Sequence, residues 1–226
     1  MSKKVSKPFL LALVVLVTAL LGLGLFLSAG TFLWLEAWIY LCIFFTFFTV
    51  YIFYFNKNDP EMLQKRAKPK FEKTWDKIVV LLMFFGFFPT FILPGFERRF
   101  IWSNVTLIVE IIGFIGMSLG LIIIFLVMKE NTFLSKTVEI QKDRGHKVIT
   151  TGPYRIVRHP MYLGFILFIL FYCLAVGSLY SLIPAGLGTI GILIRTILED
   201  RLLHKELEGY NEYAQKVKKK LIPLIW

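Results

Sequence analysis

The sequence is poor in the residues that build disulfide or metal centres. It has 226 residues, of which 2 are cysteine and 3 are histidine. Cys42 and Cys173 lie inside apolar runs, so we expect two small core residues and no disulfide framework. The spacings typical of a metal site are missing, and we expect no metal. A Gly-rich loop between a strand and a helix, which would hold a dinucleotide phosphate, is also missing.

Acidic residues are scarce as well. Asp and Glu number 15 against 26 Lys and Arg, which gives a formal net charge of +11 at pH 7. Of the basic residues, 23 lie in the terminal segments and in the polar linkers 56–77 and 129–160, whereas Arg98 and Arg99 stand between apolar runs. The positive-inside rule then predicts that both termini and both linkers face the cytoplasm. The basic excess therefore indicates contact with membrane lipids, and we expect no nucleic-acid partner.

Hydrophobic residues make up 57% of the chain and aromatic residues 16%, too much for a soluble domain of this size. The apolar runs are residues 8–29, 33–55, 78–93, 104–128 and 161–198. The last run has 38 residues, which is too long for one bilayer crossing, and its interruptions at Gly177-Ser178 and Pro184 predict a helical hairpin. We predict an all-α integral membrane protein with about six membrane-embedded helices and one membrane domain over residues 1–226.

Local signals refine this outline. Residues 1–128 are predicted to form four transmembrane helices, the third interrupted by Pro89 and Pro94 and followed by a short external loop at 97–99. In the fourth, Gly113, Gly116 and Gly120 form a small-residue face. This face favours packing within the chain over dimerisation, and the oligomeric state stays open. The linkers predict turns at Lys68-Pro69 and at residues 142–145, together with a surface helix in 56–77. An amphipathic tail follows residue 199.

One motif stands where the second linker meets the hairpin. Residues 152–164 read Gly-Pro-Tyr-Arg-Ile-Val-Arg-His-Pro-Met-Tyr-Leu-Gly. Gly152-Pro153 predicts a turn, and His159, which precedes a proline, is expected outside the helical region, so that a helix begins at Pro160 or just after. The start of that helix would direct N–H groups at the Tyr/Arg/His cluster, which suits an anionic group.

A second polar group interrupts the end of the last apolar run. Arg195 and Glu199 are four residues apart and share a helical face. They form either a structural ion pair that ends the helix or part of a functional site, and the cost of ionisable groups within membrane spans favours the site. Tyr154 and Tyr162 are either interfacial anchors or the walls of a pocket that stacks on a flat ring.

The motif at residues 152–164 is followed, nearer the C-terminus, by Arg195, Glu199-Asp200, Leu203, Tyr210 and Tyr213. This combination resembles the isoprenylcysteine carboxyl methyltransferase and phospholipid methyltransferase superfamily. The resemblance covers about residues 125–226. It implies that residues 129–226 are the catalytic region of a membrane enzyme that uses S-adenosyl-L-methionine. The implied acceptor is a lipophilic or lipidated molecule, and the implied active site faces the cytoplasm.

The resemblance also implies individual roles. Glu199 would receive the methionine ammonium of the cofactor, and Arg195 would position the acceptor, so that these two are the candidate catalytic residues. An upstream polar ligand would be Glu139 or Gln141, and Asp200 departs from the second glutamate usual in the family. The remaining cofactor-binding residues implied are His146, Lys147, Val148, Ile149, Tyr154, Arg158, His159, Pro160, Met161 and Tyr162.

Two other functions compete with methyl transfer. A membrane sterol reductase that binds NADPH would resemble the same C-terminal half, and a transporter or assembly protein would need no catalytic site. Glu199 and the Gly-Pro-Tyr-Arg form of the motif favour methyl transfer over the reductase. Apart from Glu110 and Arg195, the spans offer no charged pathway, which argues against a transporter.

Overall fold

Helices form the regular structure of the chain. The computed structural model describes residues 5–67, 71, 73–141, 144–223 and 226, and within these the elements are all helical. They are α1 (Lys7–Ala29), α2 (Leu35–Asn58), α3 (Pro60–Ala67), α4 (Thr74–Thr90), α5 (Leu93–Phe100), α6 (Leu107–Glu130), η2 (Gly152–Arg155), α7 (Pro160–Ala175), α8 (Leu182–Glu206) and α9 (Tyr210–Lys216).

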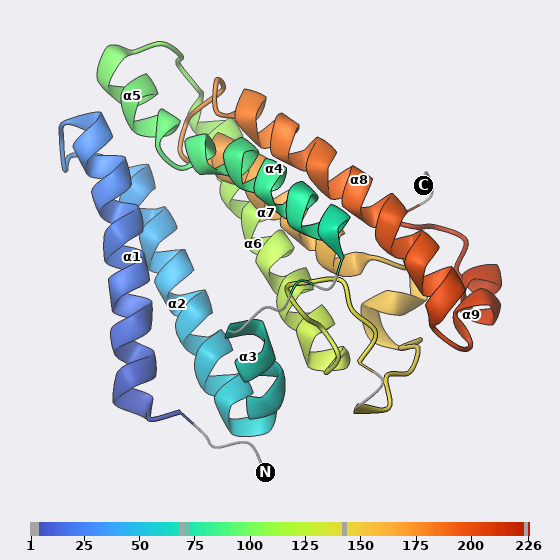
Figure 1. The fold of residues 1–226 in the computed structure, drawn as a ribbon. Coiled ribbons are helices and arrows are strands. Elements are labelled where there is room, and N and C mark those ends of the chain that lie inside the picture. Colours follow the sequence, from blue (N-terminus) through green and yellow to red (C-terminus); the bar gives the residue numbers. More distant parts are fainter. Residues whose placement is uncertain (1–4, 68–70, 72, 142–143, 224–225) are drawn as a thin grey trace.

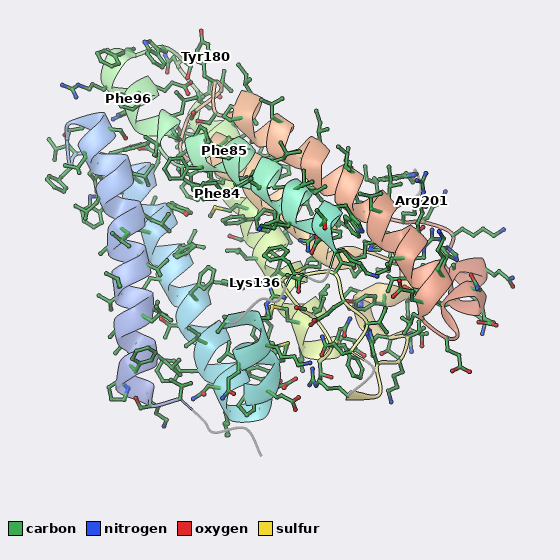
Figure 2. The ribbon with its side chains drawn as sticks, viewed as in Figure 1. Phe84, Phe85, Phe96, Lys136, Tyr180 and Arg201 are labelled. Atoms are coloured by element: carbon green, nitrogen blue, oxygen red, sulfur yellow. The ribbon has the colours of Figure 1, made fainter. Side chains whose placement is uncertain are left out.

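The long helices have the length and composition of membrane spans. In the described part of the chain, α1, α2, α6, α8 and the α4–α5 segment are long and apolar enough to cross a bilayer. Helix α7 is apolar but has 16 residues, so it spans only about 24 Å at a rise of about 1.5 Å per residue. Figure 2 shows Phe84 and Phe85 on the side of α4 turned away from α8, and both are exposed. The chain is therefore an all-α, multi-pass membrane protein.

Helix α5 replaces the external loop that the sequence predicts. The prolines do interrupt the third span, because α4 ends at Thr90 and a new helix begins at Leu93. Residues 97–99 lie within that helix, however, and Glu97 is buried. Its carboxylate accepts a hydrogen bond from the Ser178 hydroxyl and another, at 2.9 Å, from the Leu179 N–H. The loop prediction was wrong because this carboxylate caps the turn between α7 and α8.

The predicted hairpin turn lies at Gly177, whose φ of 72° is in the left-handed region that glycine adopts readily. Pro184 takes no part in the turn. It lies in the first turn of α8, where a missing N–H removes no helical hydrogen bond.

Small residues let the central helices approach closely. A Cβ atom on Gly120 would lie 2.5 Å from the Phe168 nitrogen, so the glycine face of α6 packs against α7 within the chain, as the sequence favours. A Cβ atom on Gly86 would lie 2.6 Å from the Gly188 nitrogen, which joins α4 to α8 in the same way. These two contacts fix α7 and α8, the helices that carry the polar motifs.

Figure 1 shows α1 and α2 side by side next to the group formed by α4, α6, α7 and α8. Helix α3, the connector of residues 131–159 and α9 gather at one end of the fold, and α5 lies at the opposite end. The predicted surface helix in the first linker is α3. The turn predicted at Lys68-Pro69 lies outside the described residues, as do residues 142–143 of the second predicted turn. Which end faces the cytoplasm stays a prediction from charge.

Candidate active site

A cavity of about 350 Å³ lies where the connector meets α3, α4, α7 and the end of α8. The structure places every predicted catalytic and cofactor-binding residue on its wall. They are His146, Lys147, Val148, Ile149, Tyr154, Arg158, His159, Pro160, Met161, Tyr162, Arg195 and Glu199. Two motifs that are far apart in the sequence therefore meet in one site.

The Gly-Pro-Tyr-Arg motif folds as its composition predicts. Gly152 has a φ of 56° and begins the short helix η2, and His159 is non-helical immediately before α7 begins at Pro160. Tyr154 is buried, and its hydroxyl accepts a hydrogen bond of 2.8 Å from the side-chain amide of Asn131. Burial raises the pKa of Tyr154, so its hydroxyl stays protonated at neutral pH.

Arg158 and Asp200 form a buried, bidentate ion pair. The Nε–Oδ1 and Nη2–Oδ2 distances are 2.9 and 3.1 Å. The Tyr210 hydroxyl donates to the same carboxylate at 2.8 Å, and Arg158 Nη1 donates to the carbonyls of Val217 and Lys218 at 3.0 and 3.2 Å. Arg158 thus lines the cavity while its guanidinium holds the C-terminal tail in place. Asp200 orients that guanidinium, and we refer to the Arg158–Asp200 pair with its bonds to the tail as the lock.

Glu199 lies at the polar end of the cavity. The Tyr162 hydroxyl donates a hydrogen bond to its carboxylate, and His159 Nδ1 lies 4.0 Å from Glu199 Oε1. The rings of His159 and Tyr162 are stacked, with centroids 5.9 Å apart. Unlike Asp200, whose side chain is 3% exposed, Glu199 keeps 23% of its side chain exposed. Its carboxylate is therefore oriented by Tyr162 and still accessible to a ligand.

Arg195 forms an ion pair with a residue that sequence reasoning missed. Its Nε lies 2.9 Å from Oδ1 of Asp76 on α4, and its Nη2 donates to the Lys136 carbonyl at 2.8 Å. The guanidinium also lies over the ring of Tyr162, 5.8 Å from its centroid. Arg195 and Glu199 do share a face of α8, but Tyr162 contacts both. The one sequence signal for Asp76 was an acid at the start of an apolar run.

The connector forms the opposite wall of the cavity. His146 stacks on Phe133 with centroids 4.7 Å apart, and its Nδ1 accepts from the Gln141 N–H at 3.3 Å. Burial, and then the nearby Arg144, lowers the pKa of His146 to about 4, so the imidazole is neutral at pH 7. The side chain of Gln141 is itself engaged by Phe133 and Arg144, whereas Glu139 lies on the cavity wall. Of the two candidate upstream ligands, geometry favours Glu139.

The part of the chain that carries this site matches a known protein family. Residues 108–208 match the family model described as phospholipid methyltransferase. This segment contains the connector, the Gly-Pro-Tyr-Arg motif and the whole of α8. The match covers somewhat less than half of the chain and makes this segment similar to phospholipid methyltransferases. The matched segment carries all of the predicted site residues, while Asp76 and the apolar wall that α4 contributes lie before it.

Two plant proteins are among the relatives that the chain matches. A probable protein-S-isoprenylcysteine O-methyltransferase of Oryza sativa subsp. indica is 28% identical over 132 residues, which are 55% of this chain and 63% of the relative. Protein-S-isoprenylcysteine O-methyltransferase B of Arabidopsis thaliana is also 28% identical over 132 residues, 55% of this chain and 61% of the relative. The chain therefore matches somewhat less than two thirds of the length of either relative.

Proposed function

We propose that the protein is an S-adenosyl-L-methionine-dependent methyltransferase that acts on a lipophilic or lipidated acceptor. The observation that carries this proposal is a single cavity with a polar end at Glu199 and an apolar wall from three membrane helices. Val80 and Met83 of α4, Phe165 of α7 and Ile192 of α8 form that wall. The names of the family and of the plant relatives support both the reaction and the class of acceptor.

The cofactor end of the cavity has the groups that S-adenosylmethionine requires. An accessible carboxylate, Glu199, can hold the methionine ammonium with a charge-assisted hydrogen bond. The neutral ring of His146 and the side chains of Val148 and Ile149 offer a flat, weakly polar surface for an adenine. These residues fit the cofactor, which when bound would supply an electrophilic methyl group.

The acceptor end would then be the part bounded by α4, α7 and α8. In-line methyl transfer depends mainly on alignment and on exclusion of water, and an apolar wall supplies the second. Arg195, above the ring of Tyr162, is the cation that would orient an acid group of the acceptor. Because an anionic acceptor and a sulfonium neutralise each other, a water-poor site favours their reaction.

Two measurements on the purified protein in nanodiscs test the proposal. Thermal unfolding with S-adenosylmethionine, S-adenosylhomocysteine or NADPH should show stabilisation by the first two compounds. Transfer of a radiolabelled methyl group should then be measured to an S-farnesylated cysteine derivative and to phosphatidylethanolamine vesicles. Stabilisation by NADPH alone would replace the proposal with a reductase, and a response to none of the three would indicate a protein without this catalytic site.

The cytoplasmic orientation of the site is part of the same proposal. Most basic residues, 23 of 26, belong to the terminal segments and the two linkers. The parts of these segments that the structure describes lie at the α3 and α9 end of the fold (Figure 1), and the positive-inside rule predicts that this end faces the cytoplasm. Cysteines introduced at Lys57 and at Arg98 should be labelled from opposite sides of a vesicle. Labelling of both positions from the cytoplasmic side would overturn the orientation.

A further inference from the structure

Asp76 is a buried acid that joins α4 to both sides of the cavity. Its side chain is 1% exposed. One oxygen, Oδ1, pairs with Arg195 Nε at 2.9 Å, and the other, Oδ2, accepts the Val138 N–H at 2.9 Å. Because Arg195 Nη2 also bonds to the Lys136 carbonyl, α4, α8 and residues 136–138 of the connector form a closed ring of contacts. Figure 2 shows Lys136 on the side of the connector that faces α2 and α3.

We propose that Asp76 is a positioning residue for methyl transfer, which fixes the guanidinium of Arg195 toward the acceptor and holds the connector wall against α4. This inference rests on the proposed function, because it assumes that Arg195 meets the acceptor. Asp76 lies before the segment that matches the superfamily, so the motifs in that segment do not supply this group.

The contacts of Arg195 explain how Asp76 can determine the orientation of its guanidinium. The Asp76 carboxylate lies 2.9 Å from Nε, and Nη2 donates to the Lys136 carbonyl. A guanidinium has five N–H donors, so donors remain beside these contacts for a carboxylate or a phosphate. The Tyr162 ring lies against the guanidinium face. Because Nε, Nη2 and one face contact protein groups, the guanidinium plane is held in one orientation, and the donors left for an acceptor are held with it.

Charge gives Asp76 a second effect on Arg195. A buried guanidinium without a counter-ion is strongly disfavoured, so Asp76 stabilises the charged arginine when no acceptor is present. Replacement by asparagine removes this charge but keeps the size and an oxygen that can accept the Val138 N–H. Replacement by alanine removes both contacts. The two variants therefore separate orientation of Arg195 from anchoring of the connector.

The test measures turnover and cofactor binding separately in nanodiscs. In Asp76→Asn, kcat/KM for the methyl acceptor should fall on the order of 10²-fold, as expected for a misplaced reacting group, while the Kd for S-adenosylmethionine stays within about threefold of wild type. In Asp76→Ala the cofactor should also bind more weakly, because residue 138 loses its anchor. Glu97→Gln is the matched control, since Glu97 is an equally buried acid at the α5 end. It should leave kcat/KM unchanged whatever its effect on thermal stability.

A double variant and a conservative variant complete the test. If Asp76 acts through Arg195, Asp76→Asn combined with Arg195→Lys should be about as slow as Arg195→Lys alone. Asp76→Glu keeps the charge but shifts the guanidinium, so turnover should fall while the unfolding temperature stays near that of wild type. Wild-type kcat/KM in Asp76→Asn or in Asp76→Glu would overturn the assignment alone. Lack of methyl transfer by the unmodified protein would overturn the proposed function and this assignment together.

Discussion

The lock between Arg158 and Asp200 makes a quantitative prediction about stability. The Asp200 carboxylate receives two hydrogen bonds from Arg158 and one from Tyr210, and Lys220 Nζ lies 3.3 Å away. The Arg158 and Asp200 side chains are 6% and 3% exposed, so Asp200→Asn leaves a buried, uncompensated cation. The expected loss is about 3–5 kcal/mol, which lowers the unfolding temperature of a chain of this length by about 6–20 °C.

Thermal unfolding of the protein in nanodiscs, followed by tryptophan fluorescence, measures this change. Glu206→Gln is the matched control, because Glu206 also lies on α8 and also forms an ion pair, with Lys73 at 3.0 Å. Their side chains are 39% and 32% exposed, so that pair should contribute less than about 1 kcal/mol. If Asp200→Asn lowers the unfolding temperature no more than Glu206→Gln does, the lock does not hold the C-terminal tail as described.

Three further predictions concern the cavity and its helices. Tyr162→Phe removes the hydroxyl that orients Glu199, so calorimetry should show about fivefold weaker binding of S-adenosylmethionine, corresponding to about 1 kcal/mol; unchanged affinity would contradict this role. NMR titration should give His146 a pKa of about 4. This pKa is below the value of about 6.5 in the unfolded chain. The contribution of His146 to the free energy of unfolding is therefore fully present above about pH 6.5 and is lost as the pH falls toward 4. A titration midpoint of His146 above about pH 6 would refute this prediction. Gly120→Ala places a Cβ atom against the backbone of α7 and should lower the free energy of unfolding by about 1–3 kcal/mol. In the control Gly24→Ala the new Cβ atom has nothing within 4 Å, so the free energy of unfolding should not fall. Equal unfolding temperatures of the two variants would contradict the close α6–α7 packing.

Much of the fold could be predicted because membrane helices are specified locally. Long apolar runs identify the spans, Gly177 identifies the hairpin turn, and the glycines of α6 identify the face that packs against α7. The start of α7 at Pro160 followed from the restriction that proline places on His159. Each of these features depends on residues that are neighbours in the sequence.

The contacts between distant segments could not be predicted in the same way. The Asp76–Arg195 pair depends on how α4 packs against α8, and no spacing in the sequence reveals it. Glu97 was expected in an external loop, but its carboxylate accepts hydrogen bonds from N–H groups in the turn between α7 and α8, which hold it inside. Arg158 was expected to bind the cofactor, and only the folded tail reveals its bonds to the carbonyls of residues 217 and 218.

Calorimetric titration of S-adenosylmethionine into wild type, Glu199→Gln and the exposed control Glu206→Gln tests the central claim most directly. The account predicts binding to wild type and to Glu206→Gln with equal affinity. Glu199→Gln should bind about tenfold to a hundredfold more weakly, because a hydrogen bond to a charged group contributes about 1.5–3 kcal/mol. Equal affinity of wild type and Glu199→Gln, or no binding to wild type, would contradict the claim that this cavity binds the methyl donor.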